Sequence, residues 1–422
     1  MEGLTRRSFV AGALTLASAP RSVAYGRSDR LRLGVVGVGG RGAENLRAVA
    51  HEEIAALCDV DEERLRAAMR LHPNARTYTD YRRMLDDGGL DAVVVSTPDH
   101  THACVALAAL RAGLHVYCEK PLCRTVAEVR AVRDLARQKR LVTQLGTQIH
   151  AGSNYRRVVE LVRGGAIGEV REVHTWVGGG YEHGSYPSET PPLPPGLHWD
   201  LWLGPAAYRP YHPEIAPGRW RRWWAFGNGQ LGDFGCHHMD LPHWALELRD
   251  CVRVEAEGPP PHPDAAPPWL IVRYDYPARG SQPPVRLTWY HGGRRPPHIA
   301  EGVAPDWSAG NLFVGSKGML IADYGRRQLL PASQYEGYEP PQPTIPESVG
   351  HHREWLDAIR SGGTTTCNFD YSGALTETVL LGNVAYRVGQ ALEWDSRRLR
   401  ARNCPEADGT IRQPSRPGWE EA

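Results

Sequence analysis

Short apolar runs alternate with amphipathic stretches through the first third of the chain. The runs contain many β-branched side chains and cover residues 31–36, 54–58, 91–98 and 115–118. Residues 43–50 and 103–112 have the spacing of apolar positions expected for helices. Strands that alternate with helices predict a doubly wound parallel sheet, with ligands bound at the carboxyl ends of its strands.

The rest of the chain has a different order of elements. A helix is expected at residues 154–163, and helical apolar spacing returns at 351–359 and 373–389. Between these helices the strand-like runs lie in series, at 170–177, 252–257, 269–276, 285–291 and 311–314. Such a series predicts a largely antiparallel sheet, so the fold class is α/β with a second, α+β domain.

The length and charge of the chain limit its organisation and its partners. A chain of 422 residues is longer than one hydrophobic core normally supports, so we expect two domains. We place the first domain at residues 30–150, the second at 151–400 and a loosely ordered tail at 405–422. The formal net charge of +1 argues against a nucleic-acid partner and against binding to a membrane surface.

The N-terminus has the pattern of a twin-arginine export signal. Arg6-Arg7 precedes an apolar run at residues 11–19 and small residues up to Ala24. The run is shorter than the about 20 residues that span a bilayer, which argues against a membrane anchor. We therefore predict a signal peptide at residues 1–24, the Tat export machinery as a partner, and a periplasmic or other extracytoplasmic location.

A glycine-rich sequence follows the first predicted strand. Gly37-Val38-Gly39-Gly40-Arg41-Gly42 fits the pattern G-x-G-x-x-G and leads into a predicted helix. Gly37 permits the tight turn, Gly39 lets the backbone approach a pyrophosphate, and Gly42 allows close packing of the helix. Asp59 ends the next strand, where a carboxylate binds ribose hydroxyls and repels a 2′-phosphate. This loop, with Gly40 and Arg41, predicts a dinucleotide site, and Asp59 predicts that the site prefers NAD to NADP.

Lysine is rare in this chain. Only three of the 49 Lys and Arg residues are lysines, at positions 120, 139 and 317. Lys120 follows the strand at 115–118, so it is expected at the carboxyl edge of the parallel sheet. An ammonium can lose its proton near neutral pH, whereas a guanidinium in practice cannot, which makes Lys120 a catalytic candidate. The alternative is a solvated lysine in a turn.

Asp233 and His237 are four residues apart and share one face if their segment is helical. A carboxylate can orient an imidazole and adjust its pKa, and the imidazole can then exchange the proton of a substrate hydroxyl. There are two alternatives. One is a metal site, made by His237, His238, Asp240 and His243. The other is that these groups only cap and pack, with Asp240 at the start of a helix.

The segment 187–224 is rich in proline and tryptophan. Its aromatic residues include Trp199 and Trp223, and polar residues such as Arg219 lie between them. Aromatic faces beside hydrogen-bonding groups suit a sugar ring, which has apolar C–H faces and hydroxyl edges. We take Trp199, Trp223 and Arg219 as candidates for substrate binding. The alternative is packing of this loop against the sheet.

Several of these motifs together resemble the Gfo/Idh/MocA family of sugar and cyclitol oxidoreductases. They are the glycine-rich loop, Thr97-Pro98 with His102, and Glu119-Lys120-Pro121, and the resemblance extends from about residue 31 to about residue 395. It implies an NAD-binding first domain, with Thr97, Pro98, His102 and Glu119 among the cofactor contacts. The second domain would bind substrate, and the open face of its sheet suits contact in a homo-oligomer.

The resemblance also implies which residues carry the chemistry. Lys120 would be catalytic and would contact both cofactor and substrate, and His237 would be the acid/base. Asp233 and Asp240 match acidic residues of the substrate site in the family. We expect no metal ion.

The expected reaction is hydride transfer between a tightly bound nicotinamide and a secondary alcohol of a sugar or sugar derivative. Tight binding is expected because an exported enzyme has no evident pool of free NAD. There are two alternatives. The first is a redox-neutral NAD-dependent glycosidase that oxidises a hydroxyl, eliminates the aglycone, adds water and reduces the ketone again. The second is a sugar-binding protein without catalysis.

Overall fold

The computed structural model of this protein describes residues 30–419, so the predicted signal peptide lies outside the described residues. Its first sheet has six parallel strands in the order β3-β2-β1-β4-β5-β6. The strands are β1 (Arg32–Val36), β2 (Glu53–Cys58), β3 (Arg76–Tyr78), β4 (Ala92–Val95), β5 (His115–Cys118) and β6 (Thr143–Leu145). The predicted doubly wound parallel sheet is confirmed.

Helices cover this sheet. They are α1 (Arg41–Val49), α2 (Glu62–Leu71), α3 (Tyr81–Asp86), α4 (Asp99–Arg111) and α5 (Val126–Lys139). Side chains cap the N-termini of three of them, α2, α3 and α5. The Asp61 carboxylate accepts backbone N–H groups at the start of α2, and Thr125 forms a capping box with Glu128 at the start of α5. All four residues of β4 are buried, as an apolar strand between two helical layers requires.

The second sheet has nine strands in the order β13-β12-β11-β7-β10-β9-β8-β14-β15. The pair β7–β10 is parallel and the other pairs are antiparallel, so the prediction of a largely antiparallel sheet is confirmed. The strands are β7 (Val170–Trp176), β8 (Arg253–Glu257), β9 (Leu270–Tyr276), β10 (Val285–His291), β11 (Gly310–Gly315), β12 (Met319–Ala322), β13 (Arg327–Leu330), β14 (Leu392–Asp395) and β15 (Arg400–Ala401).

The remaining helices follow the first sheet along the chain. The α-helices are α6 (Ser153–Arg163), α7 (Trp199–Leu203), α8 (Gly229–His238), α9 (Asp240–Leu246), α10 (Pro297–Ala300), α11 (His351–Ser361), α12 (Phe369–Val388) and α13 (Asp408–Ile411). The 3-10 helices are η1 (Gln148–Ala151), η2 (Trp220–Arg222), η3 (Ala332–Tyr335) and η4 (Pro405–Ala407). Within residues 30–419 no helix is long and apolar enough to cross a membrane.

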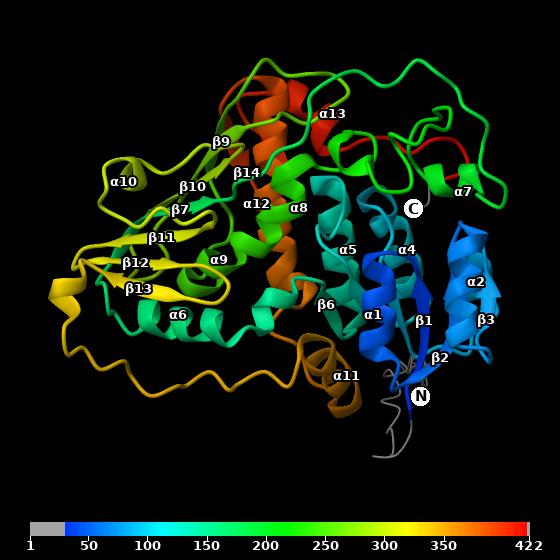
Figure 1. The fold of residues 1–422 in the computed structure, drawn as a ribbon, viewed down its shortest axis with the longest axis horizontal. Helices are drawn as coiled ribbons and strands as arrows, with labels where there is room; N and C mark the ends of the chain where they lie inside the picture. Colours follow the sequence, from blue (N-terminus) through cyan, green and yellow to red (C-terminus); the bar gives the residue numbers. More distant parts are fainter. Residues whose placement is uncertain (1–29, 420–422) are drawn as a thin grey trace, which may run out of the picture.

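The helix α12 lies between the two sheets (Figure 1). It packs against α5 on one side and against β8 and β9 on the other. Fifteen of its 20 residues are buried, which fits a helix that is apolar around most of its circumference. The helix α8 packs against α12, so α12 sets the position of α8 relative to the first sheet.

The tail beyond residue 405 differs from the prediction. It forms η4 and α13, and Ile411 and Trp419 are buried at 0% and 7% exposure. Arg416 donates to the carbonyl groups of Asp200 and Gly204, which holds the tail against the segment around α7. The expectation of a loosely ordered tail is therefore wrong for residues 405–419, because apolar side chains anchor this segment.

Candidate active site

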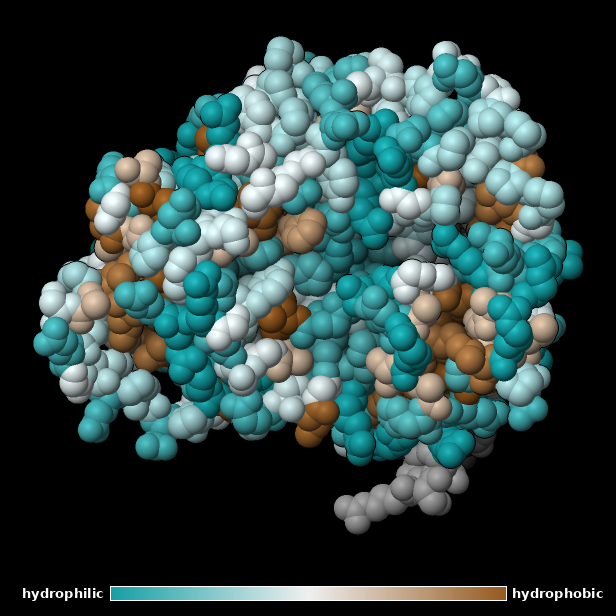
Figure 2. Space-filling model, viewed as in Figure 1, coloured by the Kyte–Doolittle hydropathy of each residue, from teal (hydrophilic) through white to brown (hydrophobic). Residues whose placement is uncertain are grey.

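A cavity of about 710 Å³ lies between the carboxyl edge of the first sheet and α8. The glycine-rich loop lines one part of it, and Lys120, Asp233 and His237 line another. Figure 2 shows a hollow between the two lobes of the molecule, with mainly hydrophilic residues around it. The cleft thus joins the predicted cofactor residues of the first domain to the predicted catalytic residues of the second.

The glycine-rich loop has the shape that its sequence predicts. Gly37 has a φ of 81°, a left-handed conformation that favours glycine. A Cβ atom on Gly42 would lie 1.9 Å from the carbonyl oxygen of Gly37, so the start of α1 can pack this closely only as glycine. Gly37, Gly39, Gly40 and Arg41 line the cavity, whereas Gly42 lies behind them. The backbone of this loop therefore leaves room for a pyrophosphate beside the N-terminus of α1.

Asp59 lies at the carboxyl end of β2 and lines the same cavity. Its carboxylate accepts the backbone N–H groups of Val38 at 2.9 Å and Asp61 at 3.0 Å. Burial raises the pKa of this carboxyl, although these two hydrogen bonds oppose the shift. Asp59 thus supports the glycine-rich loop from the position where a ribose is expected.

The other predicted cofactor residues divide into two groups. Thr97, Pro98 and Glu119 line the cavity. The Glu119 carboxylate is buried and accepts hydrogen bonds from Asn45 at 2.9 Å and Gln148 at 2.8 Å. His102 is 1% exposed and does not line the cavity; its ring nitrogens lie 2.8 Å from the carbonyl oxygens of Thr97 and Pro121. The expected cofactor contact of His102 is therefore wrong, because its ring holds the two loops together from behind.

Lys120 lies at the carboxyl end of β5, and its peptide bond to Pro121 is cis. Its ammonium donates to the backbone carbonyl of Asp233 at 2.6 Å and to the Oδ1 atom of the same residue at 2.5 Å. Arg221 and Tyr181 also donate to the Asp233 carboxylate, at 3.2 Å and 2.7 Å. Burial alone would raise the pKa of Asp233, but Lys120 and Arg221 hold it well below its usual range.

His237 lies one turn after Asp233 on α8 and also lines the cavity. Its Nδ1 atom is buried without a hydrogen-bond partner. Burial and the charge of Lys120 hold the pKa of His237 well below its usual range, so the imidazole is neutral near pH 7. The sequence predicts that Asp233 orients His237, whereas Asp233 in the structure binds Lys120, Arg221 and Tyr181. A neutral imidazole has one ring nitrogen that can accept a proton, but the lowered pKa makes His237 a weak base.

Sequence reasoning missed one buried acid of this site. Asp99 is the first residue of α4, is 4% exposed, and lines the cavity. Its Oδ2 atom accepts a hydrogen bond from Asn228 at 3.1 Å. Burial raises the pKa of Asp99 to about 7, although Lys120 opposes the shift. Its place directly after Thr97-Pro98, at the carboxyl end of a parallel strand, is the signal that could have identified it.

The predicted aromatic substrate residues do not line the cavity. Trp199 stacks on Trp202 at 4.7 Å, and its indole donates to the carbonyl of Arg209. Trp223 is fully buried, and its indole donates to the carbonyl of Glu214. Both belong to a small core inside the loop, so the alternative of loop packing is the correct one for them. Trp202 and Trp220 line the cavity instead.

Arg219 also lies outside the cavity, because its exposed guanidinium pairs with Glu214 at 3.0 Å. Arg221, which sequence reasoning missed, lies in the cavity where Arg219 was expected. Arg221 lines the cavity, pairs with Asp233 and lies over the ring of Trp220 at 4.4 Å. The two arginines differ by two positions in a 3-10 turn, and the sequence pattern alone does not distinguish their directions.

Asp240 is fully buried and does not line the cavity. Its carboxylate lies 3.0 Å from Nδ1 of His150 and accepts the hydroxyl of Tyr371 at 2.7 Å. Its expected contact with substrate is therefore wrong. Within residues 30–419 the only group with a metal-binding arrangement is His150, Asp240 and Cys367, so the four residues considered for a metal site do not come together.

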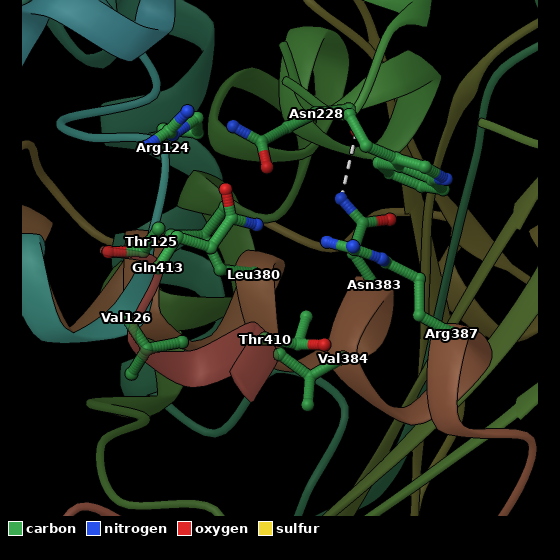
Figure 3. Close-up of a pocket in the computed structure, with 11 residues that line it drawn as sticks. Arg124, Thr125, Val126, Asn228, Leu380, Asn383, Val384, Arg387, Thr410 and Gln413 are labelled. Carbon is green, nitrogen blue, oxygen red and sulfur yellow. Dashed lines mark hydrogen bonds between the residues drawn. The ribbon is translucent and has the colours of Figure 1, made fainter. Parts of the chain in front are cut away.

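A second cavity lies behind the loop that follows Lys120 (Figure 3). Arg124, Asn228, Asn383 and Arg387 line it, and Asn383 donates to the carbonyl of Asn228. The space is no larger than a water molecule, so it holds neither a sugar nor a dinucleotide. Its polar lining links α12 to Asn228, the residue that donates to Asp99.

The six-stranded sheet with a glycine-rich loop, and the second sheet beside it, define a two-domain dinucleotide-binding protein. Two family models match the chain: the NAD-binding Rossmann fold of an oxidoreductase family over residues 31–147, and the C-terminal α/β domain of that family over residues 160–282. The matches together cover more than half of the 422 residues. The chain belongs to the Gfo/Idh/MocA family, and the prediction of an NAD-binding first domain is confirmed.

Similar characterised proteins include two inositol 2-dehydrogenases. The enzyme of Salmonella typhimurium (strain LT2) is 33% identical over 151 residues, and inositol 2-dehydrogenase 2 of Saccharopolyspora erythraea is 36% identical over 150 residues. Each match covers 34% of this chain, and they cover 45% and 44% of the two relatives. The chain therefore aligns with less than half of the length of these proteins.

Solved structures with the same fold match more of the chain. The WlbA dehydrogenase from Bordetella pertussis, solved with NADH and UDP-GlcNAcA, has a TM-score of 0.64 and 17% identity, and covers 87% of this chain and 98% of its own. Levoglucosan dehydrogenase, solved with NADH and levoglucosan, has a TM-score of 0.58 and 19% identity, and covers 86% and 99%. At these identities the likeness shows the fold.

Asp99→Asn is expected to change how stability depends on pH. The pKa of Asp99 is raised to about 7 in the folded protein, so between pH about 4 and about 7 the folded state binds more protons than the unfolded chain. This carboxyl therefore lowers stability as the pH rises through that window, by at most about 1.4 kcal/mol per pH unit. Asp99→Asn should remove this contribution.

Chemical denaturation at pH 5, 6 and 7 measures the difference between wild type and variant. Asp306→Asn is the control, because the Asp306 side chain is 77% exposed. The same pH slope in wild type and Asp99→Asn would show that Asp99 is ionised throughout this range.

Proposed function

We propose that this protein is an NAD-dependent oxidoreductase that transfers hydride between a bound nicotinamide and a secondary alcohol of a sugar or sugar derivative. One observation carries the proposal: the cavity that contains the glycine-rich loop also contains Lys120, held by ionised Asp233, and the neutral His237. The bound cofactor supplies the hydride acceptor or donor. The side chains of this chain supply orientation and proton transfer.

Each side chain has a separate task in this proposal. Asp233 fixes the ammonium of Lys120, which donates a hydrogen bond to the carbinol oxygen of the substrate. As hydride leaves the carbinol carbon, the hydroxyl proton passes to the neutral imidazole of His237. The alcohol thus loses one hydride and one proton and becomes a ketone. The reverse reaction takes the proton back from His237.

The names of similar proteins support the substrate class. The relatives named above are inositol 2-dehydrogenases, and the structural neighbours were solved with UDP-GlcNAcA or levoglucosan. These ligands are cyclic compounds with several hydroxyl groups. A cavity with charged groups at one end and aromatic residues such as Trp202 and Trp220 in its wall is suited to the same class of molecule.

We further propose that the cofactor is tightly bound, because two segments outside the first sheet cover its site. Pro194, Pro195 and Leu197 line the cavity, and Leu197 forms a β-bridge to Asp61. His198 donates its backbone N–H to the carbonyl of Val60 at 2.9 Å. This segment therefore lies across the end of β2, near the expected ribose position.

The C-terminal tail forms the second cover. Trp419 lines the cavity, and the Arg82 guanidinium lies over its ring at 4.6 Å. Arg416 forms an ion pair with Asp200 at 2.6 Å, which ties the tail to α7. Figure 1 shows the tail and the α7 segment on the same side of the first sheet. A cofactor under both segments leaves only after one of them moves.

We propose that the chain is exported, on the basis of Arg6-Arg7 and the apolar run that follows. A retained cofactor suits a compartment without free NAD, so the two proposals support each other. Fractionation of cells that express the full chain tests the location. Replacement of both arginines by lysine should keep the protein in the cytoplasm, and unchanged export would contradict a twin-arginine route.

Lys120→Arg should keep the positive charge but lower turnover by about 100-fold or more, the range of positioned proton-transfer and hydrogen-bonding groups. The planar guanidinium cannot reproduce the two bonds of the ammonium to Asp233. The measurement is turnover with a panel of sugars and cyclitols, together with the NAD content of the purified protein. Lys139→Arg is the matched control, since Lys139 is exposed on α5. Equal turnover of wild type and Lys120→Arg would remove Lys120 from the mechanism.

Trp419→Ala should increase the dissociation rate of NAD about tenfold, which corresponds to a loss of about 1.4 kcal/mol of binding free energy. Wild-type protein purified without added cofactor should contain NAD, measured in the supernatant after denaturation. Release from native protein is followed over time by filtration. Tyr338→Ala is the control, because Tyr338 is 38% exposed and outside the cavity. An unchanged release rate would show that the tail is no part of the cover.

A further inference from the structure

Three aromatic side chains lie in contact beside the cleft at its substrate end. They are the exposed Phe234 and Tyr324 and the buried His238 between them, and we call these three residues the aromatic wall. The rings of His238 and Tyr324 stack at 4.7 Å with an angle of 24°, and those of Phe234 and His238 are 6.3 Å apart. The Tyr324 hydroxyl lies 3.0 Å from Nε2 of His238. The wall therefore joins α8 to the turn between β12 and β13.

The helix α8 places the aromatic wall directly beside the reacting groups. Asp233 and His237 are four residues apart and form one stripe of the helix, and Phe234 and His238 form the neighbouring stripe. Phe234 lines the same cavity as Lys120, whereas His238 and Tyr324 lie beyond its lining. Phe234 therefore places the aromatic wall next to the space at Lys120 and His237.

Phe234 and Tyr324 are exposed, and Phe234 differs in this from the other phenylalanines among residues 30–419. Phe234 is 37% exposed and Tyr324 40%, whereas Phe226, Phe313 and Phe369 are fully buried. Phe234 is thus the one exposed phenylalanine among residues 30–419. An exposed ring does not contribute its area to the core, so its position in the cavity needs another reason.

The aromatic wall is uncharged near neutral pH. Burial lowers the pKa of His238 to about 4, and burial also raises the pKa of Tyr324 above its usual value. Phe234 and Tyr324 thus present uncharged ring surface, and Phe234 does so in the cavity of Lys120 and Asp233. A sugar has the same two properties, apolar C–H faces and polar hydroxyl edges.

We propose that the aromatic wall is a second sugar-binding subsite, which takes the ring attached to the one oxidised at Lys120 and His237. The substrate class is then a disaccharide or other glycoside rather than a free monosaccharide. This inference rests on the proposed function. A single pyranose is fixed by the groups around Lys120, and the linked ring lies against Phe234 and Tyr324.

The test uses the full-length protein with its bound NAD. The variants are Phe234→Ala, Tyr324→Ala and Phe234→Tyr, with Tyr208→Ala as matched control because Tyr208 is 71% exposed and outside the cavity. Turnover is measured with single-ring compounds, glucose and myo-inositol, and with two-ring compounds, cellobiose and maltose. Calorimetric titration with the same four compounds measures binding without turnover.

Wild type should prefer a two-ring compound. Phe234→Ala should raise the KM and the dissociation constant for the two-ring compound about tenfold, which corresponds to a loss of about 1.4 kcal/mol of binding free energy. The kcat should not change. The KM and the dissociation constant for the single-ring compounds should change less than about twofold, since these compounds do not reach the wall. Phe234→Tyr should restore most of the affinity, and Tyr208→Ala should behave as wild type.

Three results would overturn the subsite. The first is a wild type without preference for two-ring compounds. The second is an equal loss of affinity for one and two rings in Phe234→Ala. The third is a change of oligomeric state in Phe234→Ala, measured by light scattering, with unchanged KM, since the wall would then be a contact between copies. If wild type oxidises none of the four compounds, the proposed function fails for them, and calorimetry alone decides whether the wall binds a second ring.

Discussion

The ion pair between Lys120 and Asp233 is the interaction on which the cleft depends. It joins the carboxyl end of β5 to α8, so it connects the two sheets at the site where both contribute functional groups. The side chains are 14% and 15% exposed. Removal of one partner from an ion pair this far from solvent costs several kcal/mol of folding free energy. Arg221 and Tyr181 share the Asp233 carboxylate, so its remaining hydrogen-bonding positions are also used.

The position of Asp233 depends in turn on how α8 begins. Asn228 precedes the helix, donates to Asp99 on α4, and accepts a hydrogen bond from Asn383 on α12. Three helices are therefore connected through one side chain and one carbonyl. Since α12 packs on both sheets, this connection fixes Lys120, Asp99 and His237 relative to one another. The small polar cavity behind Lys120 belongs to the same connection, not to a separate ligand site.

The parts of this structure that follow from short stretches of sequence could be predicted. Apolar runs predicted nine of the fifteen strands, but not β3, β6 or the strands β12 to β15, which have four residues or fewer. The close approach at Gly42 explains why the glycine pattern locates the cofactor loop. The partners of polar side chains could not be predicted, because they depend on contacts between distant segments. Asp233 was expected beside His237, four residues away, but its partner Lys120 is 113 residues away. Trp199 and Trp223 point into their own loop for the same reason.

The geometry of the pair also gives a reason for lysine at position 120 in a chain that uses arginine at nearly all of its other basic positions. An ammonium has three N–H donors, and two of them bind the carbonyl and carboxylate of Asp233. The third donor is left for a ligand in the cavity. A guanidinium is planar and would bind the same carboxylate through its fork, with its other N–H groups directed away from the cleft. Three donors on one atom thus let a single residue hold the two domains together and, in the mechanism that we propose, bind the substrate oxygen.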